Sequence, residues 1–378
     1  MRIFITTHSS RAGGGISVAK NLLESMVAVA PQNHYFVTVP PNLGYEILCN
    51  KYECMQYLAY ETKGKLSRWY WETFELPKLV KMFRPNIVFH MANRGFINSI
   101  FPQVVYIQDS HFVYPESQYG NTSFKERLLF RYHISHLKKS LPSTNLVFCQ
   151  TPVMEERFKK TFGQDINTAI CPNQFSMFAL NDGMADCPAH LKHHDQKFKL
   201  FVLTRYYVHK NLEVIIETCK KYRDQLRDVL FVLTISEDQH PNAQRLLKAI
   251  DDNNLHEHII TVGAVDQSEL QGYYQNCHSL FLPTLLESFS GTYLEAMNYE
   301  TPIMTSDMDF ARYVCGDAAL YFDPTNVDSI FNTVIKLKNS PELTSQLVMA
   351  GKDQKERFAT SWTGIAQDVL SKLENIAH

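Results

Sequence analysis

The chain has 378 residues, of which 45% are apolar and 20% charged, and its formal net charge is −2 at neutral pH. This length suits two hydrophobic cores, and the composition excludes a disordered or fibrous chain. No apolar run approaches the roughly 18–20 residues that a membrane span needs. The first residues predict a strand and not a signal peptide. The eight scattered cysteines show no metal-binding spacing, which predicts buried, reduced thiols in a cytosolic protein.

Charge is distributed unevenly between the two halves of the chain. Residues 1–172 hold 19 Lys and Arg against 12 Asp and Glu, whereas the remainder holds 18 against 27. A basic first half can face phosphate, nucleic acid or anionic lipid, or it can be a solvated surface without a partner. No base-stacking motif accompanies the basic residues, so we expect no nucleic-acid partner.

Strand-like and helix-like segments alternate in the first half. A β-rich run at 2–7 leads into three glycines, Gly13–Gly15, and then into helical spacing over 16–30. Further strands are predicted at 34–40, 86–90, 103–109 and 145–150, and further helices at 123–140 and 151–162. Thr151 as the cap and Pro152 at the first position mark the start of the last helix.

The alternation stops near Pro172 and restarts at Phe198. Strands are predicted at 198–204, 229–236, 258–265, 279–284, 302–306 and 319–323, and helices at 210–222, 241–252 and 362–378. We therefore predict a first domain at 1–172, a linker at 173–197, a second domain at 198–358 and a final helical segment at 359–378. The final helix can cross back to the first domain.

Short apolar strands that alternate with helices indicate parallel sheets covered on both faces. The predicted fold class is α/β, with two doubly wound, Rossmann-like domains. Ligands bind such sheets beyond the carboxyl ends of the strands. A cleft between the two domains is therefore the expected site.

Three motifs follow predicted strands. Gly14 and Gly15 let a backbone approach a ligand and present N–H groups at a helix start, although a flexible turn explains them equally well. Arg205 and Lys210 are two cations suited to a diphosphate, and the alternative is a surface pair beside a helix.

The stretch LLESFSGTYLEAM, residues 285–297, carries two carboxylates. Glu295 is expected about one turn into a helix, where it can accept two hydrogen bonds from a vicinal diol such as a ribose. Glu287 lies in the preceding loop and can approach a ligand from another side. The alternative is that both acids only satisfy a helix dipole.

Taken together, these motifs resemble the retaining GT-B glycosyltransferases of family 4, also called group 1. The family's E-x7-E motif matches Glu287 and Glu295, and the following residues LEAM and TPIMTSD continue the match. Its R-x4-K motif matches Arg205 and Lys210, and its N-terminal glycine loop matches Gly14 and Gly15. The resemblance spans nearly the whole chain and is strongest over 198–324.

The resemblance implies a role for each matched residue. Glu295 would hold the nucleotide ribose and Glu287 would contact the donor sugar. Arg205 and Lys210 would stabilise the leaving diphosphate without a metal ion or other cofactor. The remaining donor contacts would come from the loop near Val265, which would lie against the base, and from Phe289, Ser290 and Gly291.

The sequence departs from the family pattern at several positions. Ser288 and Ser290 replace glycines of the E-G-F-G part, and Glu300 stands where a glycine is usual. Many members also have a histidine that faces the reaction centre, and this chain has Gln108 at that position. Asp109 or His111 can take over its task, and His111 can equally be a structural residue.

The implied function is transfer of a hexose from a UDP- or GDP-sugar, with retention, to a hydroxyl of a glycan or lipid-linked acceptor. Surface-polysaccharide or lipopolysaccharide assembly is the expected setting. Residues 63–85 mix basic and aromatic side chains, which suits an anionic membrane surface and predicts a cytoplasmic protein peripheral to the membrane. A helix packed on its own domain explains this segment too. A sugar-nucleotide 2-epimerase and a non-catalytic nucleotide-sugar-binding protein remain as alternatives.

Overall fold

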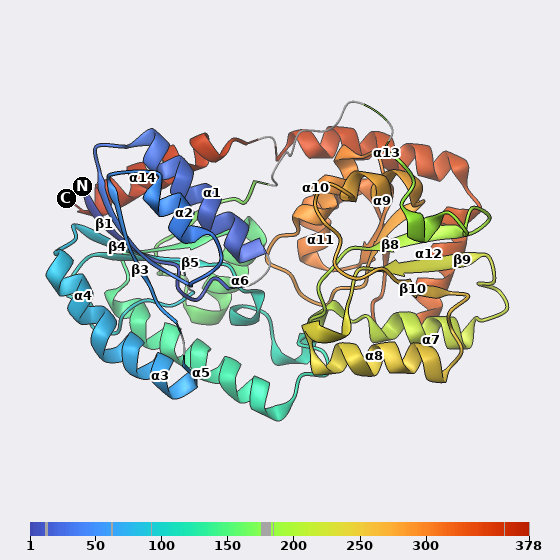
Figure 1. Ribbon diagram of the computed structural model, residues 1–378, viewed down its shortest axis with the longest axis horizontal. Helices are drawn as coiled ribbons and strands as arrows, with labels where there is room; N and C mark the ends of the chain where they lie inside the picture. Colours follow the sequence, from blue (N-terminus) through green and yellow to red (C-terminus); the bar gives the residue numbers. More distant parts are fainter. Residues whose placement is uncertain are drawn as a thin grey trace. The chain divides into compact units, whose positions relative to one another are not determined.

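A computed structural model describes residues 1–11, 14–61, 63–91, 93–174, 183, 185–358 and 360–377 (Figure 1). The chain divides into two compact units. Unit 1 contains residues 1–113, 124–174 and 360–378, and unit 2 contains residues 114–123 and 175–359. Gly13 and most of the residues between 175 and 184 lie outside the described residues.

Unit 1 is built on a parallel sheet with the strand order β3-β2-β1-β4-β5-β6-β7. The strands are β1 (Arg2–Thr6), β2 (His34–Val39), β3 (Met55–Ala59), β4 (Ile87–His90), β5 (Gln103–Ile107), β6 (Leu146–Cys149) and β7 (Thr168–Ile170). The five strands predicted in this half are confirmed. The edge strands β3 and β7 were missed because they are only partly buried and lack a continuous apolar run.

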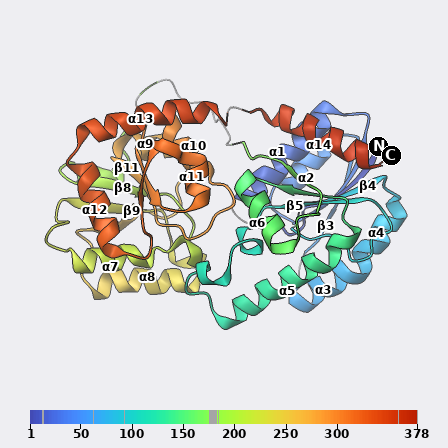
Figure 2. The same ribbon diagram turned by 180° about the vertical axis from the view of Figure 1, so that it is seen from behind.

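Helices cover both faces of this sheet (Figures 1 and 2). They are α1 (Gly14–Val29), α2 (Tyr45–Asn50), α3 (Lys65–Tyr70), α4 (Leu76–Phe83), α5 (Phe124–Ser140), α6 (Pro152–Phe162) and α14 (Trp362–Ala377), with a π-helical turn, η1 (Trp71–Glu75), joining α3 to α4. Side chains of β1 alternate between the two faces: Ile3 and Ile5 enter the core under α1 and α14, whereas Phe4 packs with residues of α4. Thr151 caps α6 by accepting the Met154 N–H at 3.1 Å, as predicted.

Unit 2 repeats the plan with the parallel order β10-β9-β8-β11-β12-β13. Its strands are β8 (Phe198–Val202), β9 (Val229–Leu233), β10 (Ile259–Thr261), β11 (Ser279–Leu282), β12 (Ile303–Ser306) and β13 (Ala319–Phe322). Its helices are α7 (Glu213–Lys221), α8 (Pro241–Asp252), α9 (Leu270–Asn276), α10 (Gly291–Asn298), α11 (Asp309–Cys315), α12 (Val327–Lys338) and α13 (Pro341–Glu356). Both predicted α/β sheets are therefore confirmed.

Each sheet has one point at which the strand order reverses. In unit 1 the chain leaves β1 toward β2 on one side, and β4 lies on the other side. In unit 2 the chain leaves β8 toward β9 on one side, and β11 lies on the other side. Loops leaving the two central strands turn to opposite faces, which opens a crevice at their carboxyl ends. Among the described residues, no helix is long and apolar enough to cross a membrane.

Glu300 follows α10 in a left-handed conformation, with φ of 57°. A side chain there costs about 1 kcal/mol, which gives a physical reason for glycine at this position. Its carboxylate pairs with Lys352 at 2.7 Å on the surface, where such pairs contribute little.

We predict that Glu300→Gly is more stable than Glu300→Ala by about 1 kcal/mol, because both variants lose the ion pair and only glycine relieves the backbone. Urea unfolding of the two variants measures the difference. At an ordinary helical or extended position alanine is the more stable of the two. An alanine variant as stable as the glycine variant would show that the backbone here carries no strain.

Candidate functional site

The crevice of unit 2 brings together the loops after β8 and β11. Arg205 and Lys210 follow β8, and Lys210 ends a short 3-10 turn, η6 (Val208–Lys210). Glu287 lies in the loop after β11. A backbone hydrogen bond of 2.8 Å from the Leu285 N–H to the His209 carbonyl ties the two loops together. The structure therefore brings the R-x4-K segment and the first acid of E-x7-E to the strand reversal of this sheet.

Lys210 and Glu287 form an ion pair in this crevice. Their side chains are only 15% and 18% exposed. A pair so shielded from water interacts more strongly than a surface pair. The resemblance assigns these two residues separate tasks and does not predict their contact. Arg205, five residues before Lys210 in the same loop, is exposed.

Glu295 lies on α10, whose position is fixed by buried hydrogen bonds. The hydroxyls of Tyr293 and Thr305 are 2.7 Å apart, and Thr305 also donates to the Leu282 carbonyl at 3.0 Å. These contacts hold α10 against β11 and β12. The helix starts at Gly291, as predicted, so Glu295 lies about one turn from its N-terminus.

The Glu295 carboxylate is largely buried and accepts a hydrogen bond of 3.0 Å from the Tyr274 hydroxyl of α9. Burial raises the pKa of Glu295, and the bond from Tyr274 opposes that rise. Tyr274 is itself fully buried. It therefore holds one carboxylate oxygen in place and leaves the other acceptor positions available to a diol. Sequence reasoning missed Tyr274, because nothing in the local pattern of α9 marks it.

The remaining predicted donor contacts lie around the same loop and helix. Ser288 and Ser290, the two residues that replace glycines of the family pattern, are buried. Phe289 is partly exposed, and its ring lies 6.0 Å from that of Phe358. Val265 is partly exposed in the segment after β10.

The other predicted residues belong to unit 1. Gly15 lies in the first turn of α1, and a Cβ built on it would be 3.8 Å from the Gln108 side-chain oxygen. The glycine loop and Gln108 are thus neighbours at the carboxyl edge of that sheet, and Gly14 has open space around its Cα. The His111 ring donates to Asp109 at 2.7 Å and stacks on Phe130 with centroids 4.1 Å apart.

This geometry allows Asp109 and His111 to act only as a linked pair. The Asp109 carboxylate also accepts the His111 backbone N–H at 3.0 Å, which closes a tight turn. His111 is buried. Among the described residues, no cluster of His, Cys, Asp and Glu could hold a metal ion.

Residues 186–354 match the protein family described as Glycosyl transferases group 1. A curated relative, the O-antigen chain mannosyltransferase RfbU of Salmonella typhimurium, is 25% identical over 138 residues. That stretch covers 36% of this chain and 38% of the relative, so the match spans well under half of either protein. The family match contains the whole crevice of unit 2.

Solved structures share the fold over the whole chain. Sucrose-phosphate synthase from Thermosynechococcus elongatus matches with a TM-score of 0.73 at 14% identity, covering 99% of this chain and 98% of that one. Anabaena HepE in complex with UDP-glucose matches with a TM-score of 0.72 at 13% identity, covering 99% and 100%. The chain has the GT-B fold, as predicted. These low identities carry no argument on substrate.

We predict that Glu295→Gln makes the protein more stable at pH 7. The pKa of Glu295 is higher in the folded protein than its ordinary value of 4.5, so the folded state binds this proton more tightly than the unfolded state. The resulting stability is present below pH 4.5 and is lost as the pH rises through the folded pKa. Glutamine keeps an oxygen for Tyr274 without the buried charge.

Thermal unfolding between pH 4 and pH 8 measures this effect. The variant's advantage in Tm should be largest at neutral pH and should shrink toward zero at the acid end. Glu237→Gln, at an exposed position, is the matched control and should follow the unaltered protein throughout. A Glu295→Gln protein that is less stable at pH 7 would contradict the account of this carboxylate.

Proposed function

We propose that the protein is a glycosyltransferase that moves a hexose from a nucleotide-sugar to a hydroxyl of a glycan or lipid-linked acceptor. The observation that carries the proposal is the Lys210–Glu287 ion pair at the strand reversal of unit 2, with Glu295 on the helix that follows the same loop, inside the stretch that matches the glycosyltransferase family. Parallel sheets bind nucleotides at this position. A UDP- or GDP-sugar is the donor that this set of groups suits.

The charges of the crevice suit the leaving diphosphate. A diphosphate arriving beside Lys210 would add at least two negative charges, so the ammonium would bond to phosphate oxygen instead of Glu287 alone. Glu287 would then accept hydrogen bonds from sugar hydroxyls. Arg205 adds a second permanent cation, and the two together would stabilise the departing group without a metal ion.

Glu295 and Tyr274 suit the ribose. The two oxygens of a carboxylate can accept both hydroxyls of a vicinal diol, and the bond from Tyr274 fixes the direction in which they point. The Glu295 carboxylate must be ionised to accept hydrogen bonds from both hydroxyls. Its raised pKa therefore predicts that donor affinity weakens on acidification at a higher pH than for an ordinary glutamate.

Retention of configuration is part of the proposal. The departing phosphate can itself take the proton of the acceptor hydroxyl, so no enzyme nucleophile is required. Gly14, Gly15 and the Asp109–His111 pair are proposed to face the acceptor or the donor from unit 1, with the pair in place of the histidine absent at Gln108. We propose surface-polysaccharide assembly, with the protein in the cytoplasm and peripheral to the membrane, as the setting.

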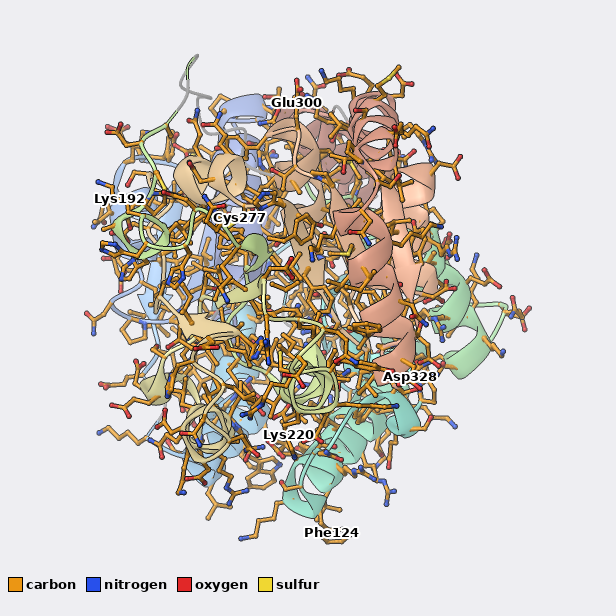
Figure 3. The ribbon with its side chains drawn as sticks, turned by 90° about the vertical axis from the view of Figure 1, so that its right-hand side faces the viewer. Phe124, Lys192, Lys220, Cys277, Glu300 and Asp328 are labelled. Carbon is orange, nitrogen blue, oxygen red and sulfur yellow. The ribbon has the colours of Figure 1, made fainter. Side chains whose placement is uncertain are left out.

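We predict that Arg205→Ala and Lys210→Ala each lower turnover about 100-fold or more, because each removes a cation aimed at charge that develops in the transition state. Steady-state release of nucleotide in the presence of acceptor measures it. Lys220→Ala is the control, since Lys220 lies on the surface of α7 and pairs with Glu217 (Figure 3). Near-normal turnover in both variants would exclude the assignment.

A double variant separates catalysis from stability at this pair. Lys210→Ala leaves the partly buried Glu287 without its cation, which lowers stability. Adding Glu287→Gln should restore Tm but should not restore turnover. Recovery of both would show that the pair is structural.

A further inference from the structure

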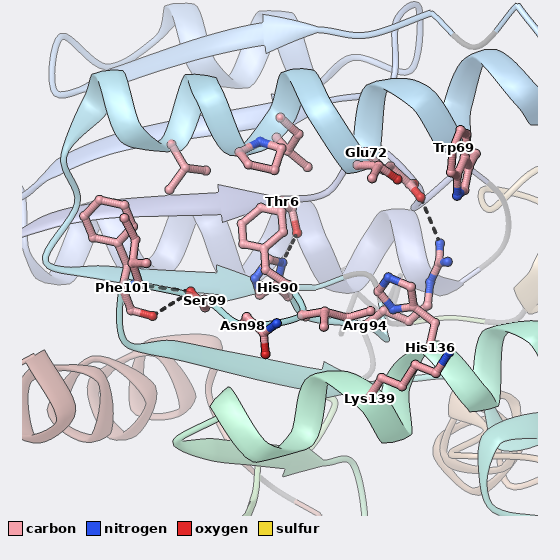
Figure 4. A pocket seen from close by; sticks show the side chains of 18 of the residues that line it. Thr6, Trp69, Glu72, His90, Arg94, Asn98, Ser99, Phe101, His136 and Lys139 are labelled. Atoms are coloured by element: carbon pink, nitrogen blue, oxygen red, sulfur yellow. Dashed lines mark hydrogen bonds and ion pairs between the residues drawn. The ribbon is translucent and has the colours of Figure 1, made fainter.

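Unit 1 contains a cavity of about 530 Å³ that none of the proposed donor residues line. It lies between the α3–η1–α4 segment and α5, and β1 and β4 form its floor (Figure 4). This volume is within the range of small-molecule sites, about 300–1,000 Å³. All of its lining residues belong to unit 1.

One end of the cavity is a partly buried charged network. Glu72, in the π-helical turn, accepts from Arg68 at 2.7 Å and from Arg94 at 3.3 Å. His8 lies 3.2 Å from the same carboxylate. Burial lowers the pKa of His8, so this imidazole is neutral at pH 7. Two arginines therefore face a single carboxylate, which leaves an excess positive charge.

Other side chains add to that charge. Lys81 and Lys139 line the cavity, and Glu72 is the one carboxylate among its lining residues. The His136 ring also lines it, and its buried Nδ1 has no hydrogen-bond partner among the described residues. Burial and the nearby Arg94 lower the pKa of His136 to about 4, so this nitrogen can serve as a neutral donor. These groups suit an anion.

The other end of the cavity is apolar. Its walls come from Leu76 and Val80 of α4 and from Phe96, Ile97 and Phe101 of the segment between β4 and β5. Figure 4 shows Glu72, Arg94, His136 and Lys139 toward one end and Ser99 and Phe101 toward the other. The cavity thus has a cationic end and an end lined mainly by apolar side chains.

Exposed apolar side chains gather on the elements that border the cavity. Most of the large hydrophobic residues that are exposed among the described residues lie on α3, η1, α4, α5 and the 97–100 segment: Leu66, Trp69, Tyr70, Phe74, Met82, Ile97, Ile100, Phe124, Leu128 and Tyr132. Figure 3 shows Phe124 projecting from the start of α5. Four of them, Trp69, Ile97, Ile100 and Tyr132, line the cavity itself. Such a concentration of exposed apolar side chains is unusual on a soluble surface and marks a site of interaction with apolar molecules.

The strand directions orient the cavity. His8 and Arg94 follow β1 and β4, so the cationic end lies at the carboxyl edge, at the strand reversal of unit 1. Phe101 precedes β5 and Val80 lies near the end of α4, so the apolar end runs toward the amino edge. A ligand would therefore present its polar head at the edge where Gly15 and Gln108 lie.

We propose that this cavity binds one molecule of a phosphate-bearing lipid, with its phosphate at Arg94, His136 and Lys139 and its hydrocarbon chain between α4 and α5. Under the proposed function, on which this identification of the acceptor rests, the lipid carries the glycan whose hydroxyl receives the sugar. The hydrocarbon can be prenyl or acyl, since both have the chemistry that the apolar end recognises.

Isothermal titration calorimetry in the absence of donor tests the site. The probes are farnesyl phosphate, a single-chain lysophosphatidic acid, farnesol and inorganic phosphate. We expect one of the two lipid phosphates to bind with one molecule per chain, at least tenfold more tightly than farnesol or phosphate. The one that binds identifies the hydrocarbon source. UDP should not displace it, because none of the residues proposed to hold the donor lines the cavity.

Three variants locate the binding. Ser135→Trp, at an exposed position of α5 that lines the cavity, should fill it and weaken binding at least tenfold. Lys139→Glu should weaken binding about tenfold by reversing a charge at the head. Lys138→Glu changes the adjacent residue, which does not line the cavity, and should alter binding less than twofold.

Three results would overturn the proposal: unchanged affinity in Ser135→Trp, equal affinity for inorganic phosphate alone, or binding to anionic vesicles without binding to either single-chain lipid. Failure of the proposed function is distinguishable, because it appears as absent donor turnover while lipid binding persists. Ser135→Trp should also leave donor affinity unchanged.

Discussion

The reversal of strand order in a parallel sheet is the constraint on which both candidate sites depend. The loops after the two adjacent strands must turn to opposite faces of the sheet. No backbone therefore covers the carboxyl ends of these strands, and polar side chains can converge there. In unit 2 this places Lys210 against Glu287, and in unit 1 it places Arg94 and His8 around Glu72. Each unit thus has a charged cluster at the one position where its sheet cannot be covered by its own helices.

Both clusters contain groups that a purely structural core would not bury. Glu295 loses solvation on folding, and the single bond from Tyr274 compensates only in part. Around Glu72, the hydrogen bond from His8 and the charges of Arg94 and Arg68 outweigh that cost and hold the carboxylate pKa well below its ordinary value. Burial therefore raises the pKa of Glu295, whereas Glu72 stays strongly ionised although it is also shielded from water. The difference lies in the groups that hydrogen-bond to Glu72 and the charges beside it. Such perturbed acids are typical of functional sites.

The sequence predicted the parts of the fold that depend on local pattern. Apolar runs such as those of β1 and β11 predicted strands, and Thr151 with Pro152 predicted the start of α6. The edge strands β3 and β7 were missed because their burial is decided by neighbours far along the chain. Motif spacing placed Lys210 and Glu287 at one crevice, yet their mutual ion pair depends on three-dimensional packing. Tyr274 and the cavity beneath α4 depend on contacts between elements that no local spacing reveals.

The measurement that tests the central claim most directly is product analysis with a panel of nucleotide-sugars. Each UDP- and GDP-sugar is first tested for stabilisation of the protein, and the one that stabilises most is then incubated with a lipid-linked or glycan acceptor. The account predicts a new glycosidic bond with the anomeric configuration of the donor, detected by NMR of the product. Formation of an epimeric nucleotide-sugar without acceptor, or no stabilisation by any nucleotide-sugar, would contradict it.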